Sequence, residues 1–467
     1  MIQLRDDAKL LPYLMALLPL TVLMAVAPWG SAWLSLIIVW TYLMYRPRQV
    51  LHPNNMVFAF YGLYIVLSST LNLLLHLIDW DYVLPWGQQV FWDTMSPKLL
   101  YQAEFTFLVL FFGLHWFCKS PHQTHRLSRE LIKVKSTWRY GLAVLSVLLV
   151  VLFMQSTAGL SAWMTDYSYT YLTKREGHGL LNVIIIALGN VAVFLLGLEA
   201  WRTRRKWPTV LVALFVMMTL SYIGGVKSRF IFLLILFLSP WFINMRFRLR
   251  TIIAMITSFF ALLYLGTLIR TEGFYASAPF FLEMLIGYFN AFQLHDWIVT
   301  SRDPGFFETV WQVFVKPLQV LGVMSPDASF DISVMLTKEY FPEQWDEEHA
   351  TQQWPLDTEL YLNYYGVWLS WLPLLMYSTM QGWLYRHAVL RANLCLMPIF
   401  VMEFQRIFST LRGTLIPWET PIYVAQYLLI YQLCRLSISH QPASGSGGVR
   451  CGSVRGTTDA RSCLSER

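Results

Sequence analysis

The stretch Thr209–Ile243, TVLVALFVMMTLSYIGGVKSRFIFLLILFLSPWFI, decides the fold, because it is apolar except at one turn. That turn, GGVKSR at 224–229, divides the 35 residues into apolar arms of 15 and 14 residues. Each arm reaches roughly 20 Å as a helix, against about 30 Å of hydrocarbon in a bilayer. Lys227 and Arg229 are therefore expected at the edge of a bilayer or in a protein cavity, and charge at that depth usually marks a binding site or a pathway.

The composition of the whole chain indicates a polytopic helical membrane protein. Of its 467 residues, 56% are hydrophobic and 13% are charged, and the mean hydropathy is +0.46. A soluble domain carries about 25% charged residues. Only helices or closed barrels satisfy every backbone polar group in lipid, and the long apolar runs do not show the alternation of a barrel. The first run, Leu11–Ala27, is interpreted as a retained helix and not as a signal peptide.

Twelve apolar segments are predicted to cross the membrane, and ten or eleven spans are also compatible because several segments are short. The segments are Leu11–Ala27, Ser31–Tyr45, Met56–Ile78, Leu99–Cys118, Tyr140–Thr157, Gly179–Ala200, Thr209–Ile223, Phe230–Ile243, Thr251–Ile269, Thr358–Met380, Asn393–Leu411 and Glu419–Leu436.

The distribution of basic residues predicts that both termini lie in the cytoplasm. With this orientation the cytoplasmic segments hold 24 of the 35 Lys and Arg residues, as the positive-inside rule requires. The net charge of +7 is thus explained by topology and does not argue for nucleic-acid binding. The five cysteines form no disulfide framework and no metal-binding CxxC pair. A bacterial inner membrane is the expected location.

We expect one transmembrane domain over residues 1–439 and a disordered cytoplasmic tail over 440–467, which is rich in Ser, Gly and Arg. The longest outside segment, Arg270–Asp357, is rich in acidic residues. Within it, Pro279–Thr300 carries polar residues at spacings of three or four, which predicts an amphipathic helix along the outer interface or over a cavity.

Cations recur at the outer ends of the predicted spans. Lys227 and Arg229 precede the eighth span, Arg270 ends the ninth, and Arg412 ends the eleventh. A Gly-Gly turn before a helix N-terminus, with Arg alongside, suits a phosphate group. If these ends converge, with Arg175 from an outside loop, they make a pyrophosphate site. Alternatively, each cation reaches the lipid head groups separately.

Acidic and histidine side chains near the outer face are candidate general bases. His295 and Asp296 lie in the predicted amphipathic helix, and Glu359 begins the tenth span, with Glu272 and Asp357 as further candidates. A base must lie within reach of the hydroxyl whose proton it accepts. Each of these side chains could instead be merely solvated.

Charged residues inside predicted spans need partners. Glu403 and Arg406 are spaced to pair along one helix face, whereas no partner is evident for Glu104. Asp79 and Asp81 form a DxD pair after the third span that could hold a divalent metal, although so short a motif has little specificity.

The segment 357–366, DTELYLNYYG, resembles the E-x-Y-x-N-F-G signature of O-antigen and oligosaccharide repeat-unit polymerases of the Wzy type. The turn at 224–229 and the basic residues Arg270 and Arg412 are similar to that family in order and spacing. Two departures are an extra residue between Asn363 and Gly366, and a lysine two residues before Arg229.

The resemblance implies a metal-independent glycosyltransferase with a GT-C-like fold and no cofactor. Such an enzyme transfers a glycan from undecaprenyl pyrophosphate to another lipid-linked repeat unit at the periplasmic face, for O-antigen, capsule or exopolysaccharide. Arg229 and Arg412 would hold the leaving group, Arg270 would assist, and Glu359, His295 or Asp296 would be the base. A chain-length-determinant protein is a further expected partner.

Three other functions fit the same pattern. A flippase for lipid-linked glycan would also have twelve spans with both termini inside, and buried Glu104, Glu403 and Arg406 favour a transporter. Against transport, no internal repeat is evident. An O-antigen ligase or a metal-dependent mannosyltransferase-like enzyme using Asp79 and Asp81 are the nearer alternatives.

Overall fold

The computed structural model describes residues 2–80, 95–119, 132–167, 170, 179–203, 207–224, 227–243, 245–246, 248–270, 277–320, 323–324, 332–348, 351–417 and 420–440. Its N-terminal elements, as far as the predicted turn at 224–229, are α1 (Ile2–Val26), α2 (Gly30–Tyr45), α3 (Pro53–Tyr61), the π-helix η1 (Gly62–Leu67), α4 (Ser68–Leu77), α5 (Pro97–Phe117), β1 (Ile132–Val134), α6 (Ser136–Thr157), α7 (Leu160–Thr165), α9 (Gly179–Arg202) and α10 (Trp207–Ile223).

After that turn follow α11 (Lys227–Phe242), α12 (Leu249–Arg270), α13 (Ala278–Tyr288), α14 (Ala291–Ser301), α15 (Gln312–Val320), α16 (Ile332–Tyr340), α17 (Pro342–Glu348), α18 (Leu356–Asn363), α19 (Val367–Tyr385), the π-helix η4 (Arg386–Leu390), α20 (Met397–Leu411), α21 (Thr420–Ser437) and β2 (Ile438–His440).

The structure confirms a helical chain with segments suited to a membrane. Within the described residues, four helices are long and apolar enough to span a bilayer, namely Pro53–Leu77, Pro97–Phe117, Ser136–Thr157 and Gly179–Arg202. Shorter apolar helices include Trp207–Ile223 and Arg229–Phe242, the two arms around the turn at 224–229. The coarse prediction of an all-α membrane protein therefore agrees with the fold.

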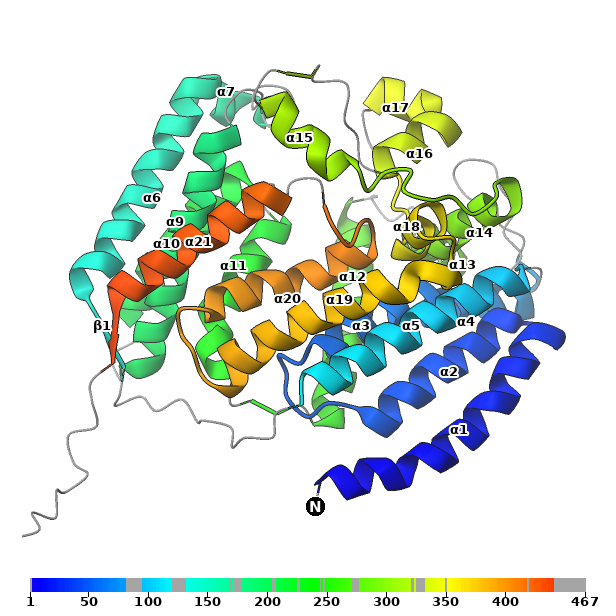
Figure 1. The fold of residues 1–467 in the computed structure, drawn as a ribbon. Helices are drawn as coiled ribbons and strands as arrows, with labels where there is room; N and C mark the ends of the chain where they lie inside the picture. The colour runs from blue at the N-terminus through cyan, green and yellow to red at the C-terminus, as the bar shows by residue number, and fades with distance from the viewer. Residues whose placement is uncertain are drawn as a thin grey trace, which may run out of the picture.

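The helices form two packed groups joined by α20 (Figure 1). In one group α5 lies along α19, and α2 packs against α1 and η1. In the other, α9 is the centre and contacts α6, α10, α11 and α21. Because α20 contacts α3 in the first group and both α9 and α11 in the second, it couples the two.

Close packing around α9 depends on a glycine. A Cβ atom added at Gly197 would lie 2.2 Å from the backbone carbonyl oxygen of Phe237 on α11. Real Cβ atoms do not approach other atoms this closely, so only glycine lets these two helix backbones meet here.

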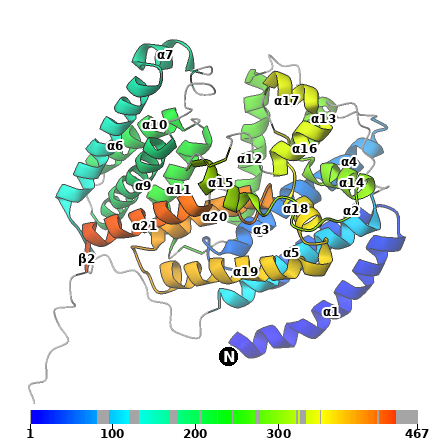
Figure 2. The same ribbon diagram turned by 45° about the horizontal axis from the view of Figure 1, so that its top comes forward.

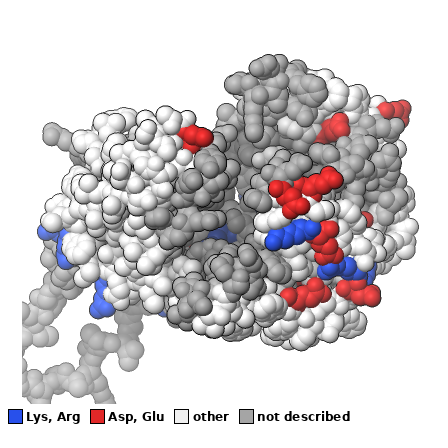
Figure 3. All heavy atoms as spheres, turned by 90° about the horizontal axis from the view of Figure 1, so that it is seen from above, with Lys and Arg blue, Asp and Glu red and all other residues white. Residues whose placement is uncertain are grey.

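A layer of shorter helices covers one end of the bundle. Figure 2 shows α16 and α17 on the opposite side of this end from α6 and α7. Beneath them, a second hydrophobic cluster includes Leu294, Trp354 and Leu362. Seen from above in Figure 3, acidic side chains surround basic ones on the half that carries α16 and α17.

The predicted span Thr358–Met380 is wrong as a single helix. The polar helix α18 ends at Asn363, and the apolar helix α19 begins at Val367. Between them, Tyr365 and Gly366 have φ angles of 51° and 61°, which break the helical path. Since α18 is polar and precedes this break, it belongs to the covering layer and lies outside the apolar helix.

The predicted amphipathic helix Pro279–Thr300 is also divided. It forms α13 and α14, separated by Phe289 and Asn290, neither of which continues the helix. Most of α14 is buried beside α18 instead of lying on an open interface.

Two short strands close the other end of the bundle. β1 precedes α6, and β2 follows α21 directly. They pair antiparallel, with Ile132 opposite His440. β2 includes His440, the first residue of the predicted tail, whereas residues 441–467 lie outside the described part of the chain, so a disordered tail there stays a prediction.

Candidate functional site

The candidate site is built around α18, a polar helix in which all eight residues are buried. A buried polar group is costly unless it is hydrogen-bonded. The hydrogen bonds of α18 therefore identify the elements that this helix connects. Its side chains reach α3, α5, α14 and the turn that follows α20.

Glu359 connects α18 to the turn after α20. Its side chain is 2% exposed, and its Oε2 atom accepts the backbone N–H of Leu415 at 2.8 Å. Burial raises the pKa of Glu359 to about 8, although the Leu415 hydrogen bond opposes this shift. A carboxyl with this pKa is suited to exchange a proton near neutral pH.

Arg412 begins the same turn, three residues before Leu415. Its guanidinium carbon lies 5.9 Å from the ring centroid of Tyr64 and 5.7 Å from that of Phe408. Tyr64 belongs to η1, and its hydroxyl donates to Gln353 at 3.1 Å. π-Helical turns are frequent at functional sites. The short turn after α20 therefore carries the cation Arg412 and also contacts the buried carboxyl of Glu359.

Asp357 is the second buried carboxyl of α18. It is fully buried, and the Tyr61 hydroxyl donates to its Oδ2 atom at 3.4 Å. Its backbone carbonyl accepts from Gln102 at 2.6 Å. Burial raises the pKa of Asp357 to about 7. Two carboxyls of the same short helix thus titrate close to neutral pH.

His295 and Asp296 are less suited to be the base than Glu359. His295 is fully buried on α14, and its Nδ1 atom lies 3.0 Å from the Thr358 hydroxyl. Burial, together with the nearby charge of Lys98, lowers the pKa of His295 to about 3, so the ring stays neutral. Asp296 is partly buried and accepts the backbone N–H of Ser96 at 3.3 Å.

Arg229 belongs to α11, and its hydrogen-bond partner Asn190 contacts a part of α20 distant from Arg412. Its Nη2 atom donates to Asn190 Oδ1 at 2.8 Å, and Asn190 lies 3.1 Å from the sulfur of Met402. A Cβ at Gly224 would lie 2.9 Å from Arg229 Cγ, so the glycine makes room for this side chain. Met402 precedes Arg412 by ten residues, which is about 15 Å along a helix.

The other predicted cations lie outside the described side chains. Lys227 begins α11 and Arg270 ends α12, but neither side chain belongs to the described part of the chain. Arg175 lies outside the described residues altogether. Their place in a shared pyrophosphate site stays a prediction.

The structure supplies partners for the charged residues of the predicted spans. Arg406 pairs with Glu403 at 3.1 Å, as their spacing predicts. The Thr21 hydroxyl donates to Glu104 at 2.6 Å, a partner that the sequence did not indicate.

Of the DxD pair, Asp81 lies outside the described residues. Where the chain is described, no group of three or more His, Cys, Asp and Glu residues is placed to hold a metal.

The sequence patterns did not predict the side-chain hydrogen bonds that hold α18 in place. Lys98 donates to the Tyr361 hydroxyl at 2.9 Å, and that hydroxyl donates to the backbone carbonyl of Arg302 at 2.8 Å. The position of Lys98 beside Pro97, at the start of a predicted span, was the one signal available. Tyr64 carried no signal, because an aromatic residue in an apolar run is ordinary.

Burial of the two carboxyls predicts a stability that depends on pH. An unfolded Glu loses its proton near pH 4.5, whereas folded Glu359 keeps it until about pH 8. The folded state binds more protons within this window, so the free energy of unfolding falls as pH rises, by about 1.4 kcal/mol per pH unit for one such group.

Thermal unfolding in detergent should show a shallower pH slope for Glu359→Gln than for the wild type. Asp346→Asn, on exposed α17, should keep the wild-type slope. Equal slopes for the wild type and Glu359→Gln would contradict the burial of a protonated carboxyl.

Comparison of the chain with models of protein families, with curated proteins and with solved structures finds no match.

Proposed function

We propose that this chain is a membrane-embedded, metal-independent glycosyltransferase that polymerises lipid-linked oligosaccharide repeat units. In this proposal it has about twelve spans and a GT-C-like architecture in a bacterial inner membrane, with its site facing the periplasm. The observation that carries the proposal is the hydrogen bond between Glu359 and Leu415. It places a buried carboxyl beside the turn that Arg412 begins.

The proposed reaction uses one base and one cationic region. A sugar hydroxyl of the acceptor repeat unit attacks the anomeric carbon of the donor glycan, and its proton passes to the carboxylate of Glu359. The bond between that carbon and the pyrophosphate oxygen breaks, and undecaprenyl pyrophosphate leaves with the bonding electrons. Arg412 stabilises the charge that develops on the leaving group. Arg229, which lies beside a part of α20 about 15 Å from Arg412, acts as a separate anion-binding cation. The raised pKa of Glu359 suits it to take up the proton.

Two other functions remain as outcomes of the test. The buried pair of Glu403 and Arg406 fits a transporter of lipid-linked glycan, because charge within apolar helices often marks a transport pathway. A ligase would transfer the glycan to a different acceptor, with the same demand for a base and a cation.

The test is an extension assay with purified protein in lipid vesicles that contain a short lipid-linked repeat unit. We expect glycan ladders in the presence of EDTA, and Glu359→Gln should slow extension at least about a hundredfold because it removes the base. The matched control Glu343→Gln changes an exposed acid on α17 and should extend normally.

Three outcomes would contradict the proposal. Movement of the glycan across the membrane without a change in length would indicate a transporter. Loss of extension with EDTA would indicate a metal-dependent enzyme. Extension by Glu359→Gln at the wild-type rate would remove Glu359 from the chemistry.

A further inference from the structure

A short loop is fastened to the end of α18 by backbone hydrogen bonds. The N–H of Gly305 donates to the carbonyl of Tyr361, the N–H of Phe307 to that of Asn363, and the N–H of Tyr365 to that of Gly305, each at 3.0 Å. The loop and the helix end therefore form one rigid unit, because the bonds run in both directions between them.

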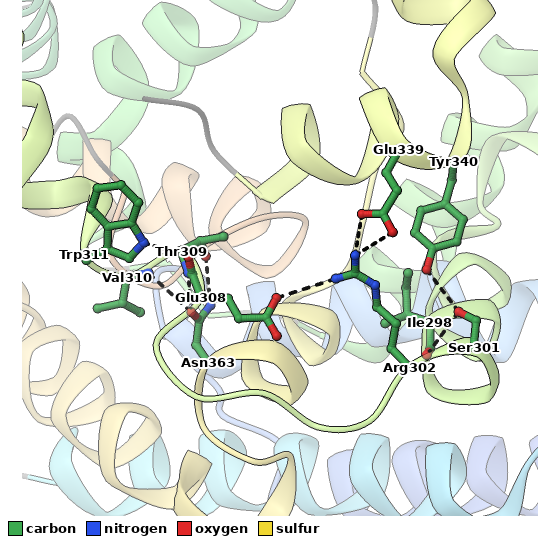
Figure 4. A network of polar contacts seen from close by, with 10 residues as sticks. All are labelled: Ile298, Ser301, Arg302, Glu308, Thr309, Val310, Trp311, Glu339, Tyr340 and Asn363. Carbon is green, nitrogen blue, oxygen red and sulfur yellow. Dashed lines mark hydrogen bonds and ion pairs between the residues drawn. The ribbon is translucent and has the colours of Figure 1, made fainter. Parts of the chain in front are cut away.

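The Asn363 side chain closes this unit. Its Oδ1 atom accepts the backbone N–H groups of Thr309 at 2.7 Å and Val310 at 3.3 Å, and its Nδ2 atom donates to the Thr309 hydroxyl at 2.9 Å. Figure 4 shows Asn363 enclosed by the loop that carries these residues. Asn363 is fully buried, so these bonds are made away from water.

The rigid unit displays aromatic side chains at its surface. Phe306, Phe307 and Tyr365 are 51%, 44% and 43% exposed, and Trp368 in the first turn of α19 is 78% exposed. We call these four residues the aromatic ledge. The rings of Phe306 and Tyr365 are stacked, with centroids 5.3 Å apart and planes within 7°.

Backbone strain is retained at the aromatic ledge. Phe307 and Tyr365 have φ angles of 57° and 51°, a left-handed conformation that costs a non-glycine residue about 1–2 kcal/mol. Exposed aromatic surface in water is a second cost. Surroundings less polar than water would offset the cost of exposing these aromatic side chains.

The neighbours of the aromatic ledge show what those surroundings are. On one side, α19 continues from Trp368 with an exposed apolar stripe that includes Leu372 and Met376. On the other side, Arg302 bridges Glu308 at 3.6 Å and Glu339 at 2.5 Å, as Figure 4 shows. The ledge thus separates an apolar helix face from a charged layer, which is the environment of lipid head groups.

We propose that the aromatic ledge is seated in the head-group layer of the leaflet on the side of α16 and α17, and that it sets the depth of α18. Tyr365 lies four residues of α18 beyond Glu359, a rise of about 6 Å, and two further residues of the break, which span at most about 7 Å. Glu359 is therefore held within about 13 Å of the aromatic ledge, close to the depth where a lipid-linked phosphate lies. This inference concerns position and does not depend on the polymerase function.

The test measures the depth of the ledge with a fluorescent label. In a chain whose five cysteines are replaced by serine, Phe306→Cys is labelled with an environment-sensitive dye and reconstituted in vesicles. Doxyl groups near the lipid head group should quench this label more strongly than doxyl groups deep in the acyl chains or iodide in the water.

Two further positions calibrate the measurement. A label at Glu343→Cys on exposed α17 should respond mainly to iodide, and a label at Met376→Cys on α19 mainly to deep doxyl groups. Tyr365→Cys provides a second position on the ledge if Phe306→Cys does not fold.

The same label tests whether the hydrogen bonds of the Asn363 side chain hold the aromatic ledge in place. Asn363→Ala keeps every aromatic residue but removes the three side-chain hydrogen bonds to the loop, so head-group quenching of the label at position 306 should fall. Iodide quenching at 306 as strong as at 343 would overturn the proposal and leave the ledge in water, where it could stack on a sugar instead. Quenching at 306 mainly by deep doxyl groups would overturn it as well.

Discussion

Replacing Gly197 by valine is expected to abolish the folded form of the protein. A Cβ at this position meets the carbonyl oxygen of Phe237 at 2.2 Å and its Cα at 3.0 Å. These are backbone atoms of α11, which cannot move aside as a flexible side chain can. Overpacking of a core typically costs about 1–3 kcal/mol, and a clash between two helix backbones lies at the upper end or beyond.

Gly141→Val is the matched control for this change. Gly141 also lies in an apolar helix, α6, but a Cβ there meets nothing within 4 Å. Size-exclusion chromatography and thermal unfolding in detergent should show aggregated or missing protein for Gly197→Val and a normal profile for Gly141→Val. If the two variants behaved alike, the close contact between α9 and α11 would be refuted.

Arg229→Ala is expected to abolish chain extension while the protein still inserts into the membrane. The Arg229 guanidinium is held by Asn190 at 2.8 Å in a region of buried side chains, where a fixed positive charge attracts an anion strongly. We expect a loss of at least about a hundredfold in the extension assay. Arg229→Lys should also lose most activity, because lysine cannot make a planar two-point contact with phosphate.

Asn190→Ala separates a catalytic role of Arg229 from a structural one. It removes the hydrogen-bond partner but leaves the guanidinium in place, so part of the extension activity should remain. If Arg229→Ala and Asn190→Ala lowered thermal stability equally and left glycan ladders of normal length, Arg229 would be a structural residue outside the site.

The sequence predicts best the features that arise from nearby residues. Apolar runs identified helices, and the spacing of Glu403 and Arg406 along one helix predicted their ion pair. Hydrophobic periodicity did not predict the points at which a long segment divides into two helices. Gly287 near the end of α13 and Asn290 at the N-cap of α14 are the residues that mark this break, and isolated Gly and Asn residues are too common to predict it against the polar spacing on both sides.

The candidate site depends on contacts that sequence patterns do not contain. Glu359, His295 and Asp296 were equivalent as candidate bases, and only tertiary packing distinguishes them. Glu359 meets the turn that Arg412 begins, whereas the ring of His295 faces Thr358. Whether distant cations converge is likewise set by helix packing, and the separation of Arg229 from Arg412 along α20 was not predictable from their shared place at helix ends.

Pairing of β1 with β2 constrains how the topology of the chain can be mapped. The backbone N–H of Lys135 donates to the carbonyl of Ser437 at 3.1 Å, next to the paired strands. Position 440 therefore lies in the same aqueous compartment as position 132. Reporter enzymes attached behind either position must agree in compartment, so one fusion serves as the internal check on the other.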